Sequence, residues 1–253
     1  MKNIDKKNIF SVKNKVVIIT GSSQGNGLEI LKGFLSHGAK VCGIDIMQPK
    51  TKELISNKKF KFIQCNLQDE SEIIEATRKI KEIYSNIDVL INNAGISISS
   101  NSISSKSSDW DATHAINLKA PYVLSNMLRP IMPKGSSIIN ITSLGSIMGF
   151  PENPSYTSSK GGLRILSKSL SLDYAKYGIR VNNVLPGYIK TAMTSKSYSN
   201  KSMKSKRDAR ISLSRWGKSE DLVGPCIFLA SDASNYITGT DIVVDGGWSS
   251  KGL

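Results

Sequence analysis

Tyr156 and Lys160 are the two residues whose types and spacing most directly suggest catalysis. Residues four apart on an α-helix lie on the same face, so the phenol and the ammonium group would be neighbours. A free phenol has a pKa of about 10 and is a poor base at neutral pH, but a nearby cation favours phenolate and lowers that pKa. Ser143 ends the apolar run before this helix, where its hydroxyl could hydrogen-bond a substrate oxygen. These three residues suggest acid–base chemistry at an alcohol or carbonyl group.

A glycine-rich loop, TGSSQGNG at 20–27, follows the first apolar, β-branched run of the chain. Glycines permit a tight turn and let the backbone approach a pyrophosphate, whose charge is favoured by the amides at a helix N-terminus. Asp45 ends the next apolar run, where a carboxylate can accept hydrogen bonds from the hydroxyls of an adenosine ribose. The order of strand, glycine loop, helix, strand and acidic residue therefore predicts a dinucleotide-binding site.

The elements that must position these residues alternate along the chain. Between the apolar runs lie segments with helical spacing, such as Leu28, Leu31 and Leu35. The alternation predicts one α/β domain over 1–253: a Rossmann-like, doubly wound parallel sheet of about seven strands, with helices on both faces. Strands buried on both faces read as continuous apolar runs, as these do. The expected strands are 15–20, 40–45, 59–64, 87–92, 136–142, 179–186 and 241–245.

Composition limits the other classes of protein. Apolar runs such as VVII (16–19) are too short to cross a membrane, and the start MKNIDKKNIF lacks the apolar stretch of a signal peptide. We therefore expect a cytoplasmic protein without a membrane partner. Cys42, Cys65 and Cys226 lack the spacing of a disulfide framework or zinc site, so buried free thiols are expected. His37 and His114 lack partners at ligand spacing, and no metal is expected.

The net charge of +14 raises the question of a nucleic-acid partner. The lysines are scattered from Lys2 to Lys251 and are not interleaved with aromatic residues. We interpret the charge mainly as a solvated surface and expect no nucleic-acid binding.

Along nearly its whole length the chain resembles the short-chain dehydrogenase/reductase family. The motifs, in that family's order, are TGSSQGNG, NNAG (92–95), INLKAP around Asn117, IINITS ending at Ser143, SYTSSK with Tyr156 and Lys160, LPGYIKT (185–191) and ITGTDIVVDGGW (237–248). The resemblance implies hydride transfer between NAD(H) and a secondary alcohol or ketone. It makes Tyr156 the acid–base residue and gives Ser143 the role of hydrogen-bonding the substrate oxygen. Lys160 would bind the nicotinamide ribose and activate Tyr156. Asn117 would position a water that links Lys160 to solvent.

The resemblance also assigns the cofactor site. Within the family the charge of Asp45 implies NAD, because it repels the 2′-phosphate of NADP and neither the loop nor Ile46 and Met47 supply a cation. Two positions depart from the pattern: Asn26 replaces an apolar residue, and Asn66 replaces a frequent aspartate that contacts adenine. The cofactor-binding residues are expected to be Gly21, Ser23, Gln24, Gly25, Asn26, Gly27, Asp45, Asn66, Leu67, Asn93, Ala94, Gly95, Tyr156, Lys160, Pro186, Gly187, Ile189 and Thr191.

The substrate is less clearly indicated. The stretches RWGKSEDLVGP (215–225) and VDGGW resemble those of dehydrogenases acting on gluconate and 2-deoxygluconate, which implies a small molecule, either a sugar acid or a related carbohydrate. One alternative is a 3-oxoacyl-acyl-carrier-protein reductase, which Asp45 opposes because those enzymes usually use NADP. The other is a nucleotide-binding protein of this fold without catalysis, which the intact Ser143, Tyr156 and Lys160 oppose.

The remaining expectations concern the lid and the assembly. The segment 188–215 is expected to fold over the substrate, with Arg210 and Arg215 as candidates to bind a carboxylate. Residues 144–153 and the Ser-rich loop 97–108 are expected to complete the pocket. Family members usually form homotetramers through two long helices, here about 107–130 and 155–177, and through the C-terminal strand, so we expect a homotetramer or a dimer.

Overall fold

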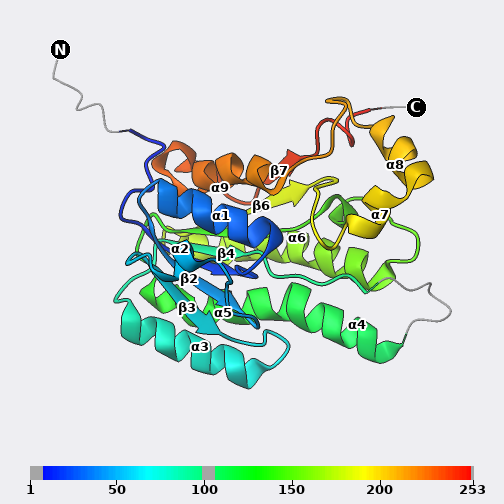
Figure 1. The fold of residues 1–253 in the computed structure, drawn as a ribbon. Helices are drawn as coiled ribbons and strands as arrows, with labels where there is room; N and C mark the ends of the chain where they lie inside the picture. The colour runs from blue at the N-terminus through cyan, green and yellow to red at the C-terminus, as the bar shows by residue number, and fades with distance from the viewer. Residues whose placement is uncertain (1–7, 99–105, 252–253) are drawn as a thin grey trace, which may run out of the picture.

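The computed structural model describes residues 8–98 and 106–251, and its centre is one parallel sheet of seven strands (Figure 1). The strands pair in the order β3-β2-β1-β4-β5-β6-β7, and each lies at a run predicted from the sequence. The predicted fold class is therefore confirmed. The strand bounds are β1 (Val16–Thr20), β2 (Lys40–Asp45), β3 (Phe60–Gln64), β4 (Val89–Asn92), β5 (Ser137–Ile141), β6 (Arg180–Pro186) and β7 (Asp241–Val244).

Helices cover both faces of the sheet. In Figure 1, α1 (Gly25–Ser36) and α9 (Val223–Ala230) lie on one side, and α3 (Glu70–Ile83) and α5 (Ala120–Leu128) lie on the other. The inner end of α6 (Pro154–Ala175) joins the second group, because Leu170 and Tyr174 pack in the same core as α3 and α5. The shorter α2 (Lys52–Ile55) adds Leu54 to the first core.

The two cores explain why the strands read as continuous apolar runs. Val17 and Ile19 of β1 face the core beneath α1 and α9, whereas Ile18 between them faces the core beneath α3 and α5. All three side chains are completely buried. Successive side chains of a strand point to opposite faces, so a strand covered on both sides is apolar at most positions, as β1 is.

The first of the two expected long helices is interrupted. In place of one helix over 107–130, the chain forms α4 (Ser107–His114), the π-helical turn η1 (Ala115–Lys119) and then α5. Single π-turns inside α-helices are rare and frequently mark functional sites. Asn117 lies within this turn and is completely buried.

A chain of buried polar side chains ties the strands on the C-terminal side together beneath α6. Asn92 Nδ2 donates to Asn140 Oδ1 (2.7 Å), and Asn140 Nδ2 donates to Ser167 Oγ (2.7 Å). Ser167 Oγ also lies 2.6 Å from Asn183 Oδ1, and Asn183 Nδ2 donates to Asp241 Oδ1 (2.8 Å). The network links β4, β5, β6 and β7, so it holds the strands whose ends carry the catalytic candidates.

Two expectations about special segments can be compared with the described residues. Cys42, Cys65 and Cys226 are free and buried, as predicted, and burial raises the pKa of each thiol to about 12. Within 8–98 and 106–251, none of the helices has the length and apolar character needed to cross a membrane.

Candidate cofactor and active site

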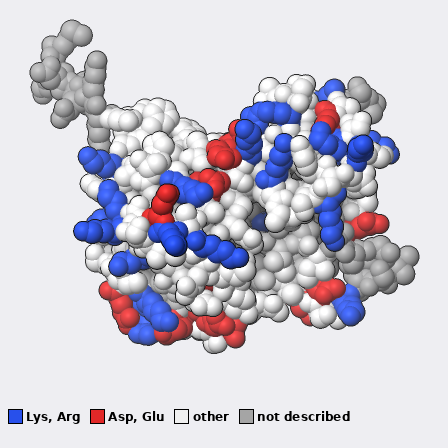
Figure 2. Space-filling view, viewed as in Figure 1, with Lys and Arg blue, Asp and Glu red and all other residues white. Residues whose placement is uncertain are grey.

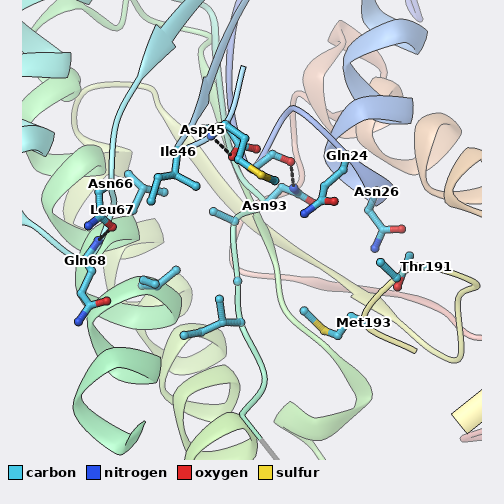
Figure 3. A pocket seen from close by; sticks show the side chains of 18 of the residues that line it. Gln24, Asn26, Asp45, Ile46, Asn66, Leu67, Gln68, Asn93, Thr191 and Met193 are labelled. Atoms are coloured by element: carbon cyan, nitrogen blue, oxygen red, sulfur yellow. Dashed lines mark hydrogen bonds between the residues drawn. The ribbon is translucent and has the colours of Figure 1, made fainter. Parts of the chain in front are cut away.

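A cavity of about 530 Å³ lies at the carboxyl ends of β1, β2 and β4 (Figure 3). The strand order reverses between β1 and β4, because β2 and β3 are added on one side of β1 and the later strands on the other. Doubly wound sheets bind ligands at this switch point. In Figure 3, Asp45, Ile46 and Leu67 lie at one side of the cavity, and Asn26 and Thr191 lie at the other. The predicted cofactor residues that line it are Gly21, Gln24, Gly25, Asn26, Asp45, Asn66, Leu67, Asn93, Ala94, Gly95 and Thr191.

Eight further lining residues were not among the predicted cofactor residues. Most adjoin a predicted residue in the sequence, so proximity to a motif was the signal that could have identified them. Ile116 is different, because it reaches the cavity through the π-turn. The eight are Ile46, Met47, Cys65, Gln68, Ile96, Ile116, Ala192 and Met193.

Several predicted residues support the cavity without lining it. Gly27 packs so closely that an added Cβ would lie 2.0 Å from the carbonyl oxygen of Gly21. Gly187 is equally tight, because a Cβ there would lie 2.6 Å from Cβ of Asp245. Ile189 is buried, Pro186 ends β6, and Ser23 donates its backbone amide to Asp45 (2.9 Å).

The glycine loop is joined to the segment after β4. Gly21 has φ +65°, and a Cβ there would lie 2.8 Å from Cα of Ala94. Asn93 Nδ2 donates to the carbonyls of Thr20 (2.9 Å) and Gly21 (3.1 Å). Thr20 Oγ1 accepts from the backbone amides of Asn93 and Ala94, both at 3.0 Å. Two loops from neighbouring strands thus form one backbone-rich floor.

Asp45 is held in place by the same end of the sheet. Its Oδ2 accepts from the Ser23 amide at 2.9 Å, and its Oδ1 accepts from the Met47 amide at 3.1 Å. The carboxylate therefore keeps a fixed position on the cavity wall. Among the residues that line the cavity in the described chain, none is Lys or Arg.

A nicotinamide dinucleotide fits these residues. Gly25 lines the cavity with φ +55°, and an added Cβ there would meet no atom closer than 3.9 Å, so the loop backbone is open to a pyrophosphate. The N-terminus of α1 points its free amides at the same place, and Asp45 offers acceptors for a ribose.

The catalytic candidates adjoin the other end of the cavity. Lys160 is 3% exposed, and its Nζ donates to the Ile141 carbonyl at 2.8 Å. A Cβ added to Gly95, which lines the cavity, would lie 3.2 Å from both Lys160 Nζ and Asn117 Oδ1. The structure thus brings Lys160 and Asn117 to the cavity wall.

Ser143 and Tyr156 form the neighbouring pair. Ser143 follows β5, and its side chain caps the short helix η3 (Leu144–Ser146) by accepting from the Gly145 amide at 3.0 Å. Tyr156 lies in the first turn of α6, one turn before Lys160, and the Ser143 side chain is near enough to lower its pKa. Three elements therefore converge on one small region: the end of β5, the start of α6 and the π-turn.

Asn117 supports the loop after β4 with its side chain. Its Oδ1 accepts from the Ile96 amide (2.9 Å), and its Nδ2 donates to the Ile96 carbonyl (2.9 Å) and to Ser159 Oγ (3.0 Å). All polar atoms of this side chain are thus used within the protein. Any water that Asn117 positions would have to be held by its backbone or by the second lone pair of Oδ1.

Burial shifts the pKa values of Tyr156 and Lys160. It raises the pKa of Tyr156, and the Ser143 side chain opposes only part of that rise. Burial also lowers the pKa of Lys160 from 10.5 to about 8. Burial disfavours phenolate and ammonium alike, so it outweighs the lowering by Ser143, and the expected lowering by Lys160 together with a bound nicotinamide ring stays a prediction.

Both departures from the family pattern have hydrogen-bond partners, and Oδ1 of Asn66 accepts from the Gln68 amide at 3.1 Å. Asn26 Oδ1 accepts from Ser219 Oγ at 2.8 Å, and Ser219 begins the short helix η4 (Ser219–Leu222). The polar side chain in the glycine loop is therefore hydrogen-bonded to a segment nearly two hundred residues away.

In the predicted lid, residues 188–215, the structure differs from the expectation at Arg215. Arg215 forms a two-pronged ion pair with Asp221, at 2.7 and 3.0 Å, so this cation is already paired. Arg210 lies over the ring of Trp248 and is exposed. The expected contribution of the Ser-rich loop falls largely on 99–105, which lie outside the described residues.

The fold and the site together define a dinucleotide-binding oxidoreductase of the doubly wound type. A family sequence model described as enoyl-(acyl carrier protein) reductase matches residues 21–249. The chain is 33% identical over 250 residues to the 2-dehydro-3-deoxy-D-gluconate 5-dehydrogenase of Dickeya dadantii, covering 96% of this chain and 99% of that one. It is 36% identical over 245 residues to the 3-oxoacyl-[acyl-carrier-protein] reductase of Thermotoga maritima, covering 93% and 98%.

A solved structure agrees with these relatives. A candidate NAD(P)-dependent gluconate 5-dehydrogenase from Beutenbergia cavernae, crystallised with bound NADP, matches with a TM-score of 0.91 at 29% identity, covering 96% of this chain and all of that one. The chain therefore belongs to the short-chain dehydrogenase/reductase family, and the predicted family is confirmed. It is an oxidoreductase that takes a nicotinamide cofactor.

The buried lysine predicts a pH-dependent stability difference. Between about pH 8 and pH 10.5 the unfolded chain binds a proton at Lys160 that the folded chain has released, so folding gains stability as pH rises through this window. Lys160→Met removes that gain. The variant should therefore become less stable relative to the wild type as pH rises. The difference between their free energies of unfolding should change by up to about 3 kcal/mol between pH 7 and pH 10.5.

Urea denaturation followed by fluorescence at several pH values measures this difference. Lys168→Met on the exposed face of α6 is the matched control, and its difference from the wild type should stay within about 0.5 kcal/mol across the range. Parallel curves for the two variants would show that Lys160 keeps an ordinary pKa.

Proposed function

We propose that this protein is an NAD-dependent dehydrogenase that interconverts a secondary alcohol and a ketone on a carbohydrate acid. The observation that carries the proposal is the position of Lys160 beside Gly95, at one end of the dinucleotide cavity, with Tyr156 one turn before it and near Ser143. We take 1–253 as one catalytic domain with 188–215 as its lid. The protein is proposed to be cytoplasmic and to have no nucleic-acid partner.

The four catalytic candidates have separate roles in this proposal. The nicotinamide, when bound, accepts or supplies the hydride. The Ser143 hydroxyl binds the substrate oxygen, and Tyr156 exchanges a proton with the same oxygen. Lys160 holds the ribose hydroxyls and favours phenolate, and the backbone of Asn117 holds a water that connects Lys160 with solvent.

The direction of the pKa shift at Tyr156 bears on the reaction. Burial keeps the phenol protonated at neutral pH, which suits donation to a carbonyl oxygen during reduction. Alcohol oxidation requires the opposite transfer. It should therefore become faster as pH rises, whereas reduction should become slower.

The preference for NAD is proposed from charge. Asp45 lies on the cavity wall, and Ile46 and Met47 after it carry no charge. A ribose 2′-phosphate placed beside this carboxylate would be repelled, and like charges in contact cost several kcal/mol. Because the solved relative from Beutenbergia cavernae holds NADP, the proposal depends on this chain's own residues.

A sugar acid is the proposed substrate because the Dickeya dadantii relative is a dehydrogenase of 2-dehydro-3-deoxy-D-gluconate. A carrier-protein reductase is a second candidate, supported by the 36% identity to the Thermotoga maritima enzyme. A panel of sugar acids, neutral polyols and 3-oxoacyl thioesters, assayed with both cofactors by nicotinamide absorbance, separates the two candidates.

Assembly into a homotetramer or a dimer is supported by apolar residues that the single chain leaves uncovered. On α6, Ile165 is 56% and Leu172 is 78% exposed, and the two are seven residues apart on one face. A groove of about 490 Å³ beside this helix is lined by residues including His114, Leu118 and Tyr122. A second copy of the chain covering this surface would remove it from water.

Tyr156→Phe tests the catalytic role. The variant keeps the ring but lacks the exchangeable proton, so kcat should fall at least about a hundredfold while the Kd for NADH changes less than about threefold. Steady-state rates and fluorescence titration measure the two quantities. Tyr177→Phe, an exposed tyrosine at the end of the same helix, should leave both unchanged. Retention of more than a few per cent of activity in Tyr156→Phe would assign the proton transfer to another group.

Asp45→Ala with Ile46→Arg tests the cofactor proposal. The pair removes the repelling charge and adds a cation at a cavity-lining position, so the kcat/KM ratio of NADP to NAD should rise at least about a hundredfold. Asp173→Ala, a distant exposed carboxylate, should leave the ratio unchanged. Equal or better turnover with NADP in the unmodified enzyme contradicts the proposal.

Light scattering tests the assembly. The mass should be two or four times the 27.6 kDa of one chain, and Leu172→Glu should shift it toward the monomer, because the charge would be buried against the second copy. Ile74 is a similarly exposed apolar residue on a different helix, α3, and Ile74→Glu serves as the control. A wild-type mass of one chain is the contrary result.

A further inference from the structure

The segment after β6 and the C-terminal tail form a cluster in which cationic side chains pack over aromatic rings. Tyr188 lies 5.3 Å from Trp216 and 5.5 Å from Trp248, measured between ring centres, and Tyr198 lies 5.1 Å from Trp216. Four cations lie over these rings. We call the set the lid cluster, and its members are Tyr188, Lys190, Tyr198, Lys204, Arg207, Arg210, Trp216 and Trp248.

Within the lid cluster, two buried donors differ from the rest. Arg207 lies 4.7 Å from the centre of the Tyr188 ring and 6.0 Å from that of Trp216. Its Nη1 is buried and has no hydrogen-bond acceptor in the described part of the chain, and the same holds for Nε1 of Trp248. By contrast, Trp216 Nε1 donates to Asp208 (2.7 Å).

Such donors are costly and point to a ligand. A buried donor without an acceptor loses about 1–3 kcal/mol, and more when it is charged. Unpaired buried groups in native proteins therefore call for an explanation, and a polar ligand is one. Both donors belong to side chains in contact with Tyr188, so one molecule carrying several oxygens could reach both.

The lid cluster begins beside the catalytic candidates. Tyr188 follows β6 directly after Gly187, and Ser143 follows β5, the neighbouring strand. Because the two strands are parallel, both residues lie beyond the same edge of the sheet. Thr191, three residues after Tyr188, lines the cofactor cavity.

The C-terminal DGGW motif brings Trp248 to this place. Gly246 and Gly247 have φ values of +65° and +80°, which favour glycine, and an added Cβ would lie 3.0 Å from Ile211 and 2.9 Å from Ser212. Leu213 also donates its amide to the Gly246 carbonyl at 3.0 Å. The close crossing of these two backbones sets the position of the indole.

We propose that Arg207 and Trp248 form the subsite that binds the carboxylate of the substrate. A carboxylate accepts from guanidinium and indole N–H groups, and charge-assisted hydrogen bonds in a partly dry site are strong. The inference rests on the proposed function and assigns its preference for an acid to two side chains. The other cations over α7 (Ser195–Ser199) and α8 (Lys201–Asp208), visible as a basic lobe in Figure 2, attract the anion only at longer range.

Calorimetric titration of D-gluconate into the NADH-bound enzyme tests the subsite. Arg207→Gln should raise the Kd at least tenfold, and Trp248→Phe, which removes only the indole donor and some ring area, should raise it about threefold or more. Lys206→Gln removes the same charge from an exposed neighbour on α8 and should change the Kd less than twofold at fixed ionic strength. Equal effects of Arg207→Gln and Lys206→Gln would overturn the subsite, as would no binding of gluconate to the wild type.

Activity separates this inference from the function on which it rests. With NAD, Arg207→Gln should lower kcat/KM for D-gluconate at least tenfold but leave that for neutral glucitol within about twofold. If the wild type oxidises neither compound yet binds gluconate in an Arg207-dependent way, the proposed reaction fails and the subsite stands. Arg207→Lys covers the case of a misfolded glutamine variant, because it keeps the charge but loses the planar fork, and an unchanged Kd for both variants overturns the subsite.

Discussion

The close backbone contact between the glycine loop and the segment after β4 is the constraint on which the site depends. At Gly21 and Gly27 an added methyl group would lie within 2.8 Å of backbone atoms. The two loops end neighbouring strands at the switch point of the sheet, so the contact closes the floor of the cavity and fixes Gly95 at its far end. Since Gly95 also abuts Lys160 and Asn117, the geometry of the catalytic candidates is set by the same contact.

Lys160 shows how the protein places a costly group. Its burial lowers the pKa to about 8, so the folded state holds the ammonium at neutral pH against a desolvation penalty. The Ile141 carbonyl offsets part of that cost, because it accepts a hydrogen bond from Nζ at 2.8 Å. A lysine with a purely structural role would be more stable with its ammonium group in water. The desolvation cost at Lys160 is therefore explained by a functional site that requires this group.

The sequence predicted what depends on local pattern. All seven strands followed from apolar runs, because strands covered on both faces are mostly apolar, and the glycine loop and Asp45 followed from turn chemistry. What it missed depends on contacts between distant segments. Neither the π-turn at Asn117 nor the bond of Asn26 to Ser219 has a local signature, and the raised pKa of Tyr156 comes from burial. Arg215 looked like a substrate ligand until its partner Asp221 was visible.

The lid poses a different physical problem, because a segment so rich in lysine and arginine has little apolar surface with which to fold. The cations of this segment lie over aromatic rings. Such a cation–π contact stabilises the folded state by about 0.5–1 kcal/mol at an exposed site and by more when it is desolvated. The rings come from the segment itself, from Trp216 just after it and from the C-terminal tail, and they order the cations while leaving Nη1 of Arg207 and Nε1 of Trp248 without an acceptor in the described part of the chain. Donors left over in this way are available to a ligand. The fold and the cofactor floor can therefore be shared across a family, while we propose that the side chains of the segment 188–215 make the choice of substrate.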